Sequence, residues 1–123
     1  MAYDEDLADR IRELVSLEPG LDEKRMFGGL AFLVRGHLAV AASGRGGLMV
    51  RVDPAHSARL LATTTARPME MRGRLMFGWL RVDASEITTK RKLEPWVMRG
   101  VAYARSLPPK ERPAPTRSRR EDT

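Results

Sequence analysis

Cysteine is absent from the 123 residues, and histidine occurs only twice, at His37 and His56. Without cysteine the chain cannot form a disulfide scaffold, an iron–sulfur centre, a thiolate zinc site or a cysteine nucleophile. Long apolar runs are also missing, since Leu30–Val34 and Leu38–Ala42 are far shorter than the ~20 residues that cross a bilayer. The first six residues include three acidic and no basic side chains, whereas a signal peptide begins with basic residues and an apolar run. We therefore predict a cytoplasmic protein.

Recognisable catalytic motifs are lacking as well. The two histidines lie in different predicted elements, and no Gly-x-Ser-x-Gly nucleophile motif or paired acid and base is evident. The glycine-rich stretch 43–47 precedes a strand instead of opening a helix, so it is interpreted as a hairpin loop and not as a phosphate loop. The sequence predicts neither an enzyme nor a cofactor or metal site. A deep pocket lined by His37 or Glu70 would favour an enzyme instead.

Basic charge is carried almost entirely by arginine. The chain has 22 Lys plus Arg against 16 Asp plus Glu, a formal net charge of +6, and only 4 of the basic residues are lysines. The planar guanidinium suits phosphate or carboxylate recognition, although a GC-rich genome would favour arginine codons without any functional reason. Residues 108–123 hold four prolines and no large apolar side chain, which predicts a disordered tail after a domain at residues 1–107. The candidate nucleic-acid contacts are Arg45, Arg112, Arg117, Arg119 and Arg120.

Apolar spacing predicts helices and strands in alternating groups. Three helices are expected, at residues 3–16, at 53–61 and along the apolar stripe 93–107. Asp53-Pro54 supplies an N-cap and a proline at the first helical position, and residues 83–86 resemble a capping box. Five strands are expected, at residues 25–34, 37–42, 48–52, 68–71 and 77–82.

The predicted order of elements is α-β-β-β-α-β-β-α. Gly28-Gly29 is interpreted as a bulge within the first strand, and turns are expected at residues 35–36 and 72–74. Consecutive strands joined by short turns form an antiparallel meander. We therefore predict a two-layer α+β domain with a five-stranded antiparallel sheet and helices.

One face of this sheet carries an unusual set of side chains. If Leu48, Val50 and Val52 point inward, the intervening residues point to the opposite face. That face then holds Met49, Arg51, Trp79 and Arg81. Methionine, tryptophan and arginine are typical of protein interfaces. A register shift of one residue would instead bury Met49 and Trp79 in the core, and both interpretations stay open.

Four sequence blocks resemble the TfoX N-terminal domain of the TfoX/Sxy family. They are Arg-Met-Phe-Gly-Gly-Leu-Ala-Phe at 25–32, Leu-Met-Val-Arg-Val-Asp-Pro at 48–54, residues 67–82, and Trp96-Val97 with residues 100–108. The resemblance covers about residues 3–108. It implies an α-β-β-β-α-β-β-α fold similar to that of type III secretion chaperones. It also implies a link to natural competence, in which full-length members act as positive regulators alongside the cyclic-AMP receptor protein.

Two functions are compatible with these observations. Full-length competence regulators carry a second domain resembling a helix-hairpin-helix module, which this sequence does not include. The first hypothesis is therefore a non-enzymatic adaptor or regulator that binds a partner protein, or a second copy of itself as a homodimer. The alternative is a nucleic-acid-binding accessory protein, whose affinity through the basic tail would be weak and sensitive to salt. No membrane or metal partner is expected.

Overall fold

A six-stranded antiparallel sheet organises the computed structural model, which describes residues 3–26 and 28–109. The strands are β1 (Leu21–Met26), β2 (Gly29–Val34), β3 (His37–Ala42), β4 (Leu48–Arg51), β5 (Arg67–Met71) and β6 (Arg74–Val82). Their order across the sheet is β1-β2-β3-β4-β6-β5. The helices are α1 (Glu5–Val15), α2 (Pro54–Thr63) and α3 (Lys90–Ser106). The α+β class and the order of elements are confirmed, with one strand more than predicted.

The additional strand is β1, at the edge of the sheet. The prediction of one continuous strand with a bulge at Gly28-Gly29 is wrong, because Gly28 adopts a φ of +76° and the chain reverses there. Residues Leu21–Met26 then pair antiparallel with β2. The sequence pattern missed this strand because four consecutive charged residues, 22–25, occupy it and remain exposed. Charged side chains are typical of an exposed edge strand, because they oppose pairing with another chain.

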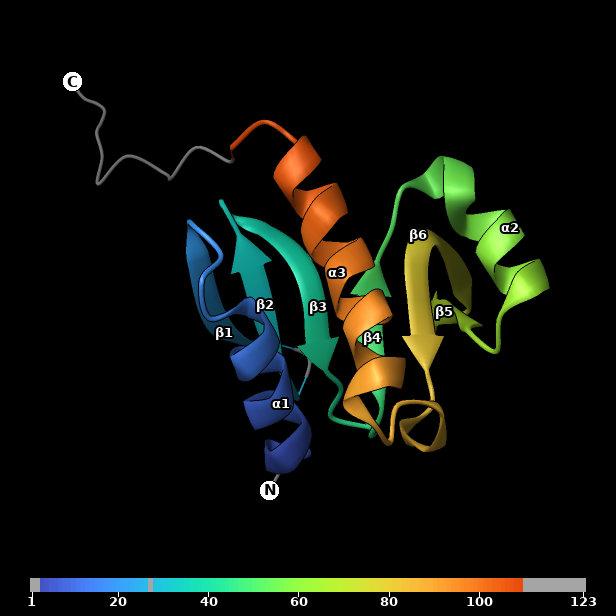
Figure 1. Cartoon of the computed structure of the whole chain (residues 1–123). Coiled ribbons are helices and arrows are strands. Elements are labelled where there is room, and N and C mark those ends of the chain that lie inside the picture. Colours follow the sequence, from blue (N-terminus) through green and yellow to red (C-terminus); the bar gives the residue numbers. More distant parts are fainter. Residues whose placement is uncertain (1–2, 27, 110–123) are drawn as a thin grey trace.

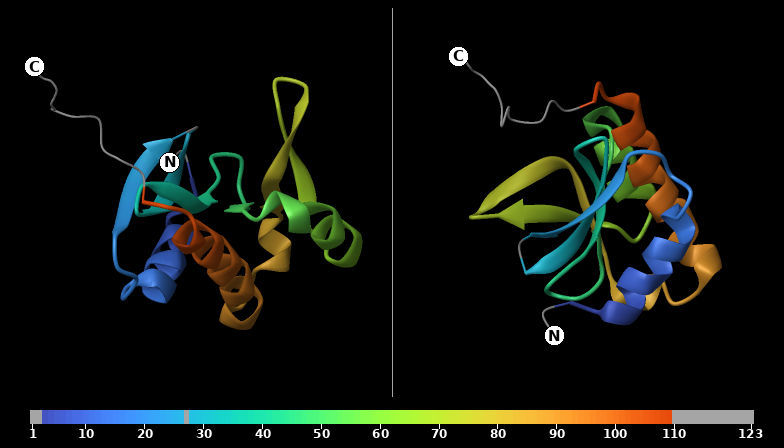
Figure 2. Two further views of the ribbon diagram at one scale, coloured as in Figure 1. Left: turned by 90° about the horizontal axis from the view of Figure 1, so that it is seen from above. Right: turned by 90° about the vertical axis from the view of Figure 1, so that its left-hand side faces the viewer.

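The helices α1 and α3 cover one face of the sheet (Figure 1). Phe32, Val50 and Leu80, from three different strands, point toward these helices and are fully buried. Viewed from above and from the side, the β5–β6 hairpin projects away from the helices, and the β1–β2 end of the sheet bends in the same direction (Figure 2). The sheet therefore has a helix-covered face and an opposite, concave face.

Capping residues mark the starts of α2 and α3, but the capping box predicted before α3 does not form. Asp53 caps α2 as predicted, because its carboxylate accepts the Ala55 N–H at 2.9 Å. The capping box expected at residues 83–86 is wrong: those residues form a short 3₁₀ turn, and Asp83 instead pairs with Arg67 at 2.6 Å. Thr89 caps α3, which begins at Lys90. The predicted tail lies outside the described residues from residue 110 onward.

Ser57 attaches α2 to the sheet. Its side chain is buried, and its hydroxyl oxygen accepts the backbone N–H of Gly78 at 3.1 Å. Gly78 has a φ of +84° and lies in the irregular part of β6, where the register with β5 shifts. The hydrogen bond therefore fixes the point from which the β5–β6 hairpin projects.

We expect Ser57→Ala to lower the free energy of unfolding by about 1–3 kcal/mol, because the buried Gly78 N–H would lose its acceptor. Ser106→Ala is the matched control, since that exposed hydroxyl donates only to a carbonyl of its own helix. Urea denaturation of both variants measures the difference. Equal stability of the two variants would contradict this role of Ser57.

Candidate functional site

A second apolar cluster lies on the concave face of the sheet, opposite the helices. Its buried members are Ala31, Leu38, Ala41 and Met49, and Met26, Leu33, Met69 and Trp79 pack against them. Among the described residues, no helix belongs to this cluster. The sheet therefore carries an apolar surface that only its own strands and loops shield.

The four residues predicted to share this face are brought together by strand pairing. In the antiparallel register of β4 and β6, Met49 lies opposite Arg81 and Arg51 lies opposite Trp79. Directly opposed residues of paired strands point to the same side of a sheet. Leu48 and Val50 face the helix-side core, so the register has the inward-facing residues that the alternation predicted.

Met49, Arg51, Trp79 and Arg81 are called the Met/Arg face below. Met49 is buried, whereas the other three are partly exposed. The guanidinium carbon of Arg51 lies 5.4 Å from the centre of the Trp79 ring and 5.6 Å from that of Tyr103 on α3. Arginine over an aromatic face is a favourable contact that limits the freedom of both side chains. Trp79 is thereby held in place at the surface.

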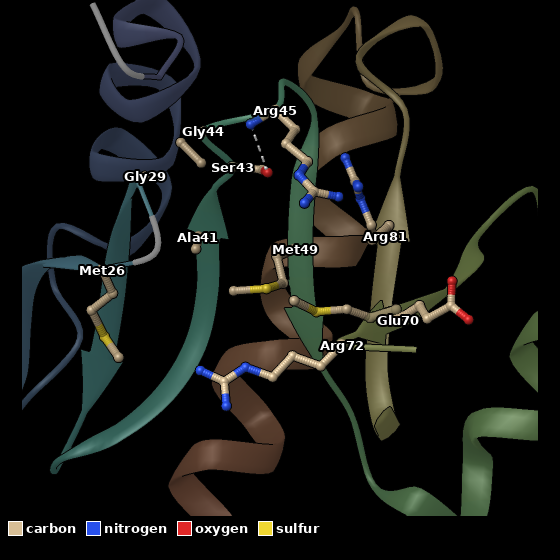
Figure 3. A pocket seen from close by; sticks show the side chains of 12 residues that line it. Met26, Gly29, Ala41, Ser43, Gly44, Arg45, Met49, Glu70, Arg72 and Arg81 are labelled. Carbon is tan, nitrogen blue, oxygen red and sulfur yellow. Dashed lines mark hydrogen bonds between the residues drawn. The ribbon is translucent and has the colours of Figure 1, made fainter. Parts of the chain in front are cut away.

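An open pocket of about 310 Å³ adjoins the Met/Arg face (Figure 3). It is called the methionine pocket here. Its lining residues are Met26, Gly29, Ala41, Ala42, Ser43, Gly44, Arg45, Met49, Met69, Glu70, Arg72 and Arg81. They come from both ends of the sheet and from the loops and turns between strands, so the curvature of the sheet creates the pocket.

Close backbone packing forms one end of the pocket. The loop 43–47 is a hairpin, as predicted, in which Ser43 N–H donates to the Gly47 carbonyl at 3.0 Å. A Cβ atom on Gly44 would lie 2.6 Å from the Gly28 carbonyl oxygen, and one on Gly29 would lie 2.2 Å from that of Ala42. Glycine at these positions therefore allows the loop to approach the β1–β2 turn.

Three arginines surround the pocket without carboxylate partners. Within residues 3–26 and 28–109, no ion pair involves Arg45, Arg72 or Arg81. Arg81 donates to the Gly46 carbonyl at 3.4 Å, so its guanidinium lies against the loop that carries Arg45. Figure 3 shows the carboxylate of Glu70 turned away from the arginines. This part of the surface is therefore cationic and open to an anionic group.

Other arginines of the chain do have acidic partners. Arg12 contacts Glu23 at 2.7 Å, and the Arg105 guanidinium forms two hydrogen bonds with Glu18. Hydrogen bonding to Glu23 raises the pKa of Arg12, and hydrogen bonding to Glu18 raises that of Arg105. These pairs connect helices to neighbouring segments on the surface. The arginines around the methionine pocket have no such structural partner among the described residues.

The histidines do not join the pocket. The His37 Nε2 atom lies 2.6 Å from the Pro108 carbonyl oxygen, just beyond α3. His56 is exposed and lines a separate groove of about 500 Å³ between α2 and α3, with Arg59, Arg99 and Tyr103. Glu70 does line the methionine pocket, but no second titratable acid or base lies beside it there apart from arginines. This geometry supplies no acid–base pair for catalysis.

Sequence reasoning placed Arg45 at a loop tip and missed three other residues of the site. Met26 and Met69 contribute to the second apolar cluster, and Arg72 reaches the pocket from the β5–β6 turn. The alternation of β5 places Met69 on one face, but only the curvature of the sheet brings it near Met26. The candidate contacts Arg112, Arg117, Arg119 and Arg120 lie outside the described residues.

A comparison with protein families matches residues 13–104 to the TfoX N-terminal domain. The chain belongs to the TfoX N-terminal domain family. The matched range runs from within α1 into the last turn of α3, so it contains the whole sheet and the methionine pocket. The resemblance found in the four sequence blocks is thereby confirmed. No curated protein matches the chain.

Membership of the TfoX N-terminal domain family points to a regulatory, competence-related role. Members of this family are not known as enzymes, and the site described above adds no evidence for catalysis. Among the described residues, none of the helices combines the length and apolar character needed to cross a bilayer.

Proposed function

We propose that this TfoX N-terminal domain protein is a non-enzymatic adaptor that binds a partner protein through its Met/Arg face. The observation that carries the proposal is the rim of the second apolar cluster: its central residues are buried, but Met26, Leu33, Met69 and Trp79 around them are partly exposed, and no helix of the described residues covers them. Soluble domains rarely expose a continuous apolar surface without using it for binding. Methionine adapts its shape to different partners, and tryptophan and arginine contribute much of the binding energy at interfaces.

The charge around this surface indicates the chemistry of the partner segment. Arg45, Arg72 and Arg81 form no ion pair with the described residues, so carboxylates of the partner can replace water around them. Two further apolar side chains, Leu75 and Phe77 on the β5–β6 hairpin, are 54% and 77% exposed. The expected partner segment therefore carries apolar side chains flanked by acidic residues.

The edges of the sheet argue against binding by strand addition. β1 exposes four consecutive charged residues, and β5 contains Pro68, which has no N–H to donate. A homodimer formed by joining sheet edges is therefore disfavoured. A homodimer through the Met/Arg face stays compatible with the proposal, with the acidic residues of a second copy as the partner segment.

We expect Trp79→Ala to abolish binding of the partner or of a second copy, because it removes the exposed ring that packs against Met49 and Arg51. Sedimentation equilibrium measures self-association, and quantitative affinity capture from the native host measures partner binding. Leu17→Ala is the control, since Leu17 is 94% exposed outside this face. The proposal would be contradicted if the unaltered protein and the Leu17→Ala control were both monomeric and captured no specific partner.

Nucleic-acid binding is a second candidate, favoured by the groove between α2 and α3. Arg59 and Arg99 line this groove together with His56 and Tyr103, and Arg59 and Arg99 form no ion pair within the described residues. Such a groove suits the phosphates of a nucleic acid. The two sites meet where Arg51 contacts Tyr103, but Arg59 and Arg99 line only the groove, so substituting them tests the second candidate separately.

Fluorescence anisotropy with labelled DNA and RNA tests this second candidate. Binding that survives physiological salt and is lost in Arg59→Gln/Arg99→Gln would support it. Full-length protein with glutamine at the four tail arginines separates the contribution of the tail from that of the groove. Binding that disappears at physiological salt would leave the adaptor proposal as the better account.

A further inference from the structure

We propose that the methionine pocket binds a small amphipathic carboxylate, with the alkyl chain against the methionines and the carboxylate at Arg45 and Arg81. The class of ligand is a single-chain fatty acid of medium length, because the pocket is at the small end of the range for small-molecule sites. This inference concerns a small-molecule site and does not require a protein partner. It rests on the polarity of the pocket, on its volume and on the absence of carboxylate partners.

The pocket is apolar over its floor. Met26, Met49 and Met69 line it together with Ala41 and Gly29. Met49 is buried in the second apolar cluster, and Met26 and Met69 pack against that cluster from opposite ends of the sheet. Unbranched thioether side chains adjust to an alkyl chain with little strain.

The cationic end of the pocket is defined by the loop 43–47. Arg45 extends from this loop, and the hydrogen bond from Arg81 to the Gly46 carbonyl holds the second guanidinium beside it. In Figure 3 both side chains lie at this end, whereas Arg72 extends across the pocket from the β5–β6 turn. Two guanidinium groups without a carboxylate among the described residues repel each other, and a bound carboxylate would relieve that repulsion.

The volume of the pocket suits a small molecule. About 310 Å³ lies at the lower end of the ~300–1,000 Å³ found for small-molecule sites. A single alkyl chain can lie along the methionines while its head group remains at the exposed arginines. A phosphate without an apolar chain would leave the methionine floor uncovered.

Occupation of the pocket would alter the adaptor surface. Met49 and Arg81 belong both to the methionine pocket and to the Met/Arg face. A bound carboxylate would neutralise Arg81 and cover Met49, so it would compete with an acidic partner segment. This regulatory consequence alone rests on the proposed adaptor function.

Methyl NMR of the full chain labelled with ¹³C at the methionine methyl groups tests the binding site directly. The probe is sodium decanoate, added below its micelle concentration. We expect saturable shifts of the Met26, Met49 and Met69 signals, without a shift of Met98, which packs on the helix side of the sheet. Arg45→Gln/Arg81→Gln should weaken decanoate binding by at least about tenfold, because both partners of the carboxylate are lost.

Two controls establish the specificity of the effect. Arg59→Gln/Arg99→Gln removes the same charge from the groove on the other side and should leave decanoate binding unchanged. Decyltrimethylammonium has the same alkyl chain with a cationic head and should not bind. No shift of the three methionines, equal shifts at Met98, or equal binding of the cationic probe would overturn the proposal. None of these outcomes decides whether the protein binds a partner, because the Trp79→Ala experiment measures partner binding without decanoate.

Discussion

Gly100→Ala is expected to destabilise the protein by about 1–3 kcal/mol, the cost of overpacking a core. Gly100 lies in α3 where the helix crosses β3, and a Cβ atom there would lie 2.2 Å from the Ala39 carbonyl oxygen and 2.8 Å from Val40 Cγ1. Both neighbours are buried, so the helix itself would have to move away from the sheet. For a domain of this size the melting temperature should fall by roughly 5–20 °C.

The direction of the stability change in Gly100→Ala distinguishes overpacking against β3 from the effect of helix propensity. Helix propensity alone predicts that alanine stabilises a helix interior by about 0.8–1 kcal/mol relative to glycine. Ala102→Gly, at an exposed position of the same helix, is the control and should lose about that amount. Thermal unfolding followed by circular dichroism compares the variants. A higher melting temperature for Gly100→Ala would show that α3 does not contact β3 closely.

Arg81→Glu is expected to weaken binding of the partner protein by at least about 30-fold. Arg81 lies opposite Met49 on the Met/Arg face, and the only hydrogen bond of its side chain with the described residues is the long one to the Gly46 carbonyl. Charge reversal would place a carboxylate against the acidic partner segment. The fold should tolerate the change, because Arg81 forms no ion pair with a described residue.

Arg59→Glu changes the net charge by the same amount on the other side of the molecule. Titration of the captured partner with each variant, by isothermal calorimetry, separates a local effect at Arg81 from a general effect of charge. We expect full affinity for Arg59→Glu. Equal weakening by both variants would indicate nonspecific electrostatic attraction and would contradict a site at the Met/Arg face.

The central strands could be predicted because β2 and β3 are short, almost entirely apolar runs and β4 alternates between its two faces. Leu48 and Val50 point to one side while Met49 and Arg51 point to the other, which is one of the two facings that the sequence had left open. β1 could not be predicted in the same way, because its exposed charged residues show no alternation. Its position at the edge depends on the reversal at Gly28 and on pairing with β2.

Of the candidate site, only the Met/Arg face could be predicted from the sequence. Met49, Arg51, Trp79 and Arg81 lie on adjacent strands, so strand alternation alone could place them on one face. Met26 and Met69 lie on strands near opposite ends of the sheet, and they line one pocket only because the sheet bends. The bent sheet contains the positive φ of Gly78 and register shifts in the β2–β3 and β5–β6 pairs, and sequence periodicity reveals none of these.

Site-specific photo-crosslinking tests the central claim that the concave face is the binding surface. A benzoylphenylalanine side chain is introduced at Arg72 on the β5–β6 turn, beside the Met/Arg face, and separately at Ala102, which is exposed on α3 at the opposite groove. After irradiation in the native host, we expect one specific protein crosslink from position 72 and none from position 102. A crosslink from position 102 alone would contradict the account and place the partner on the helix side of the molecule.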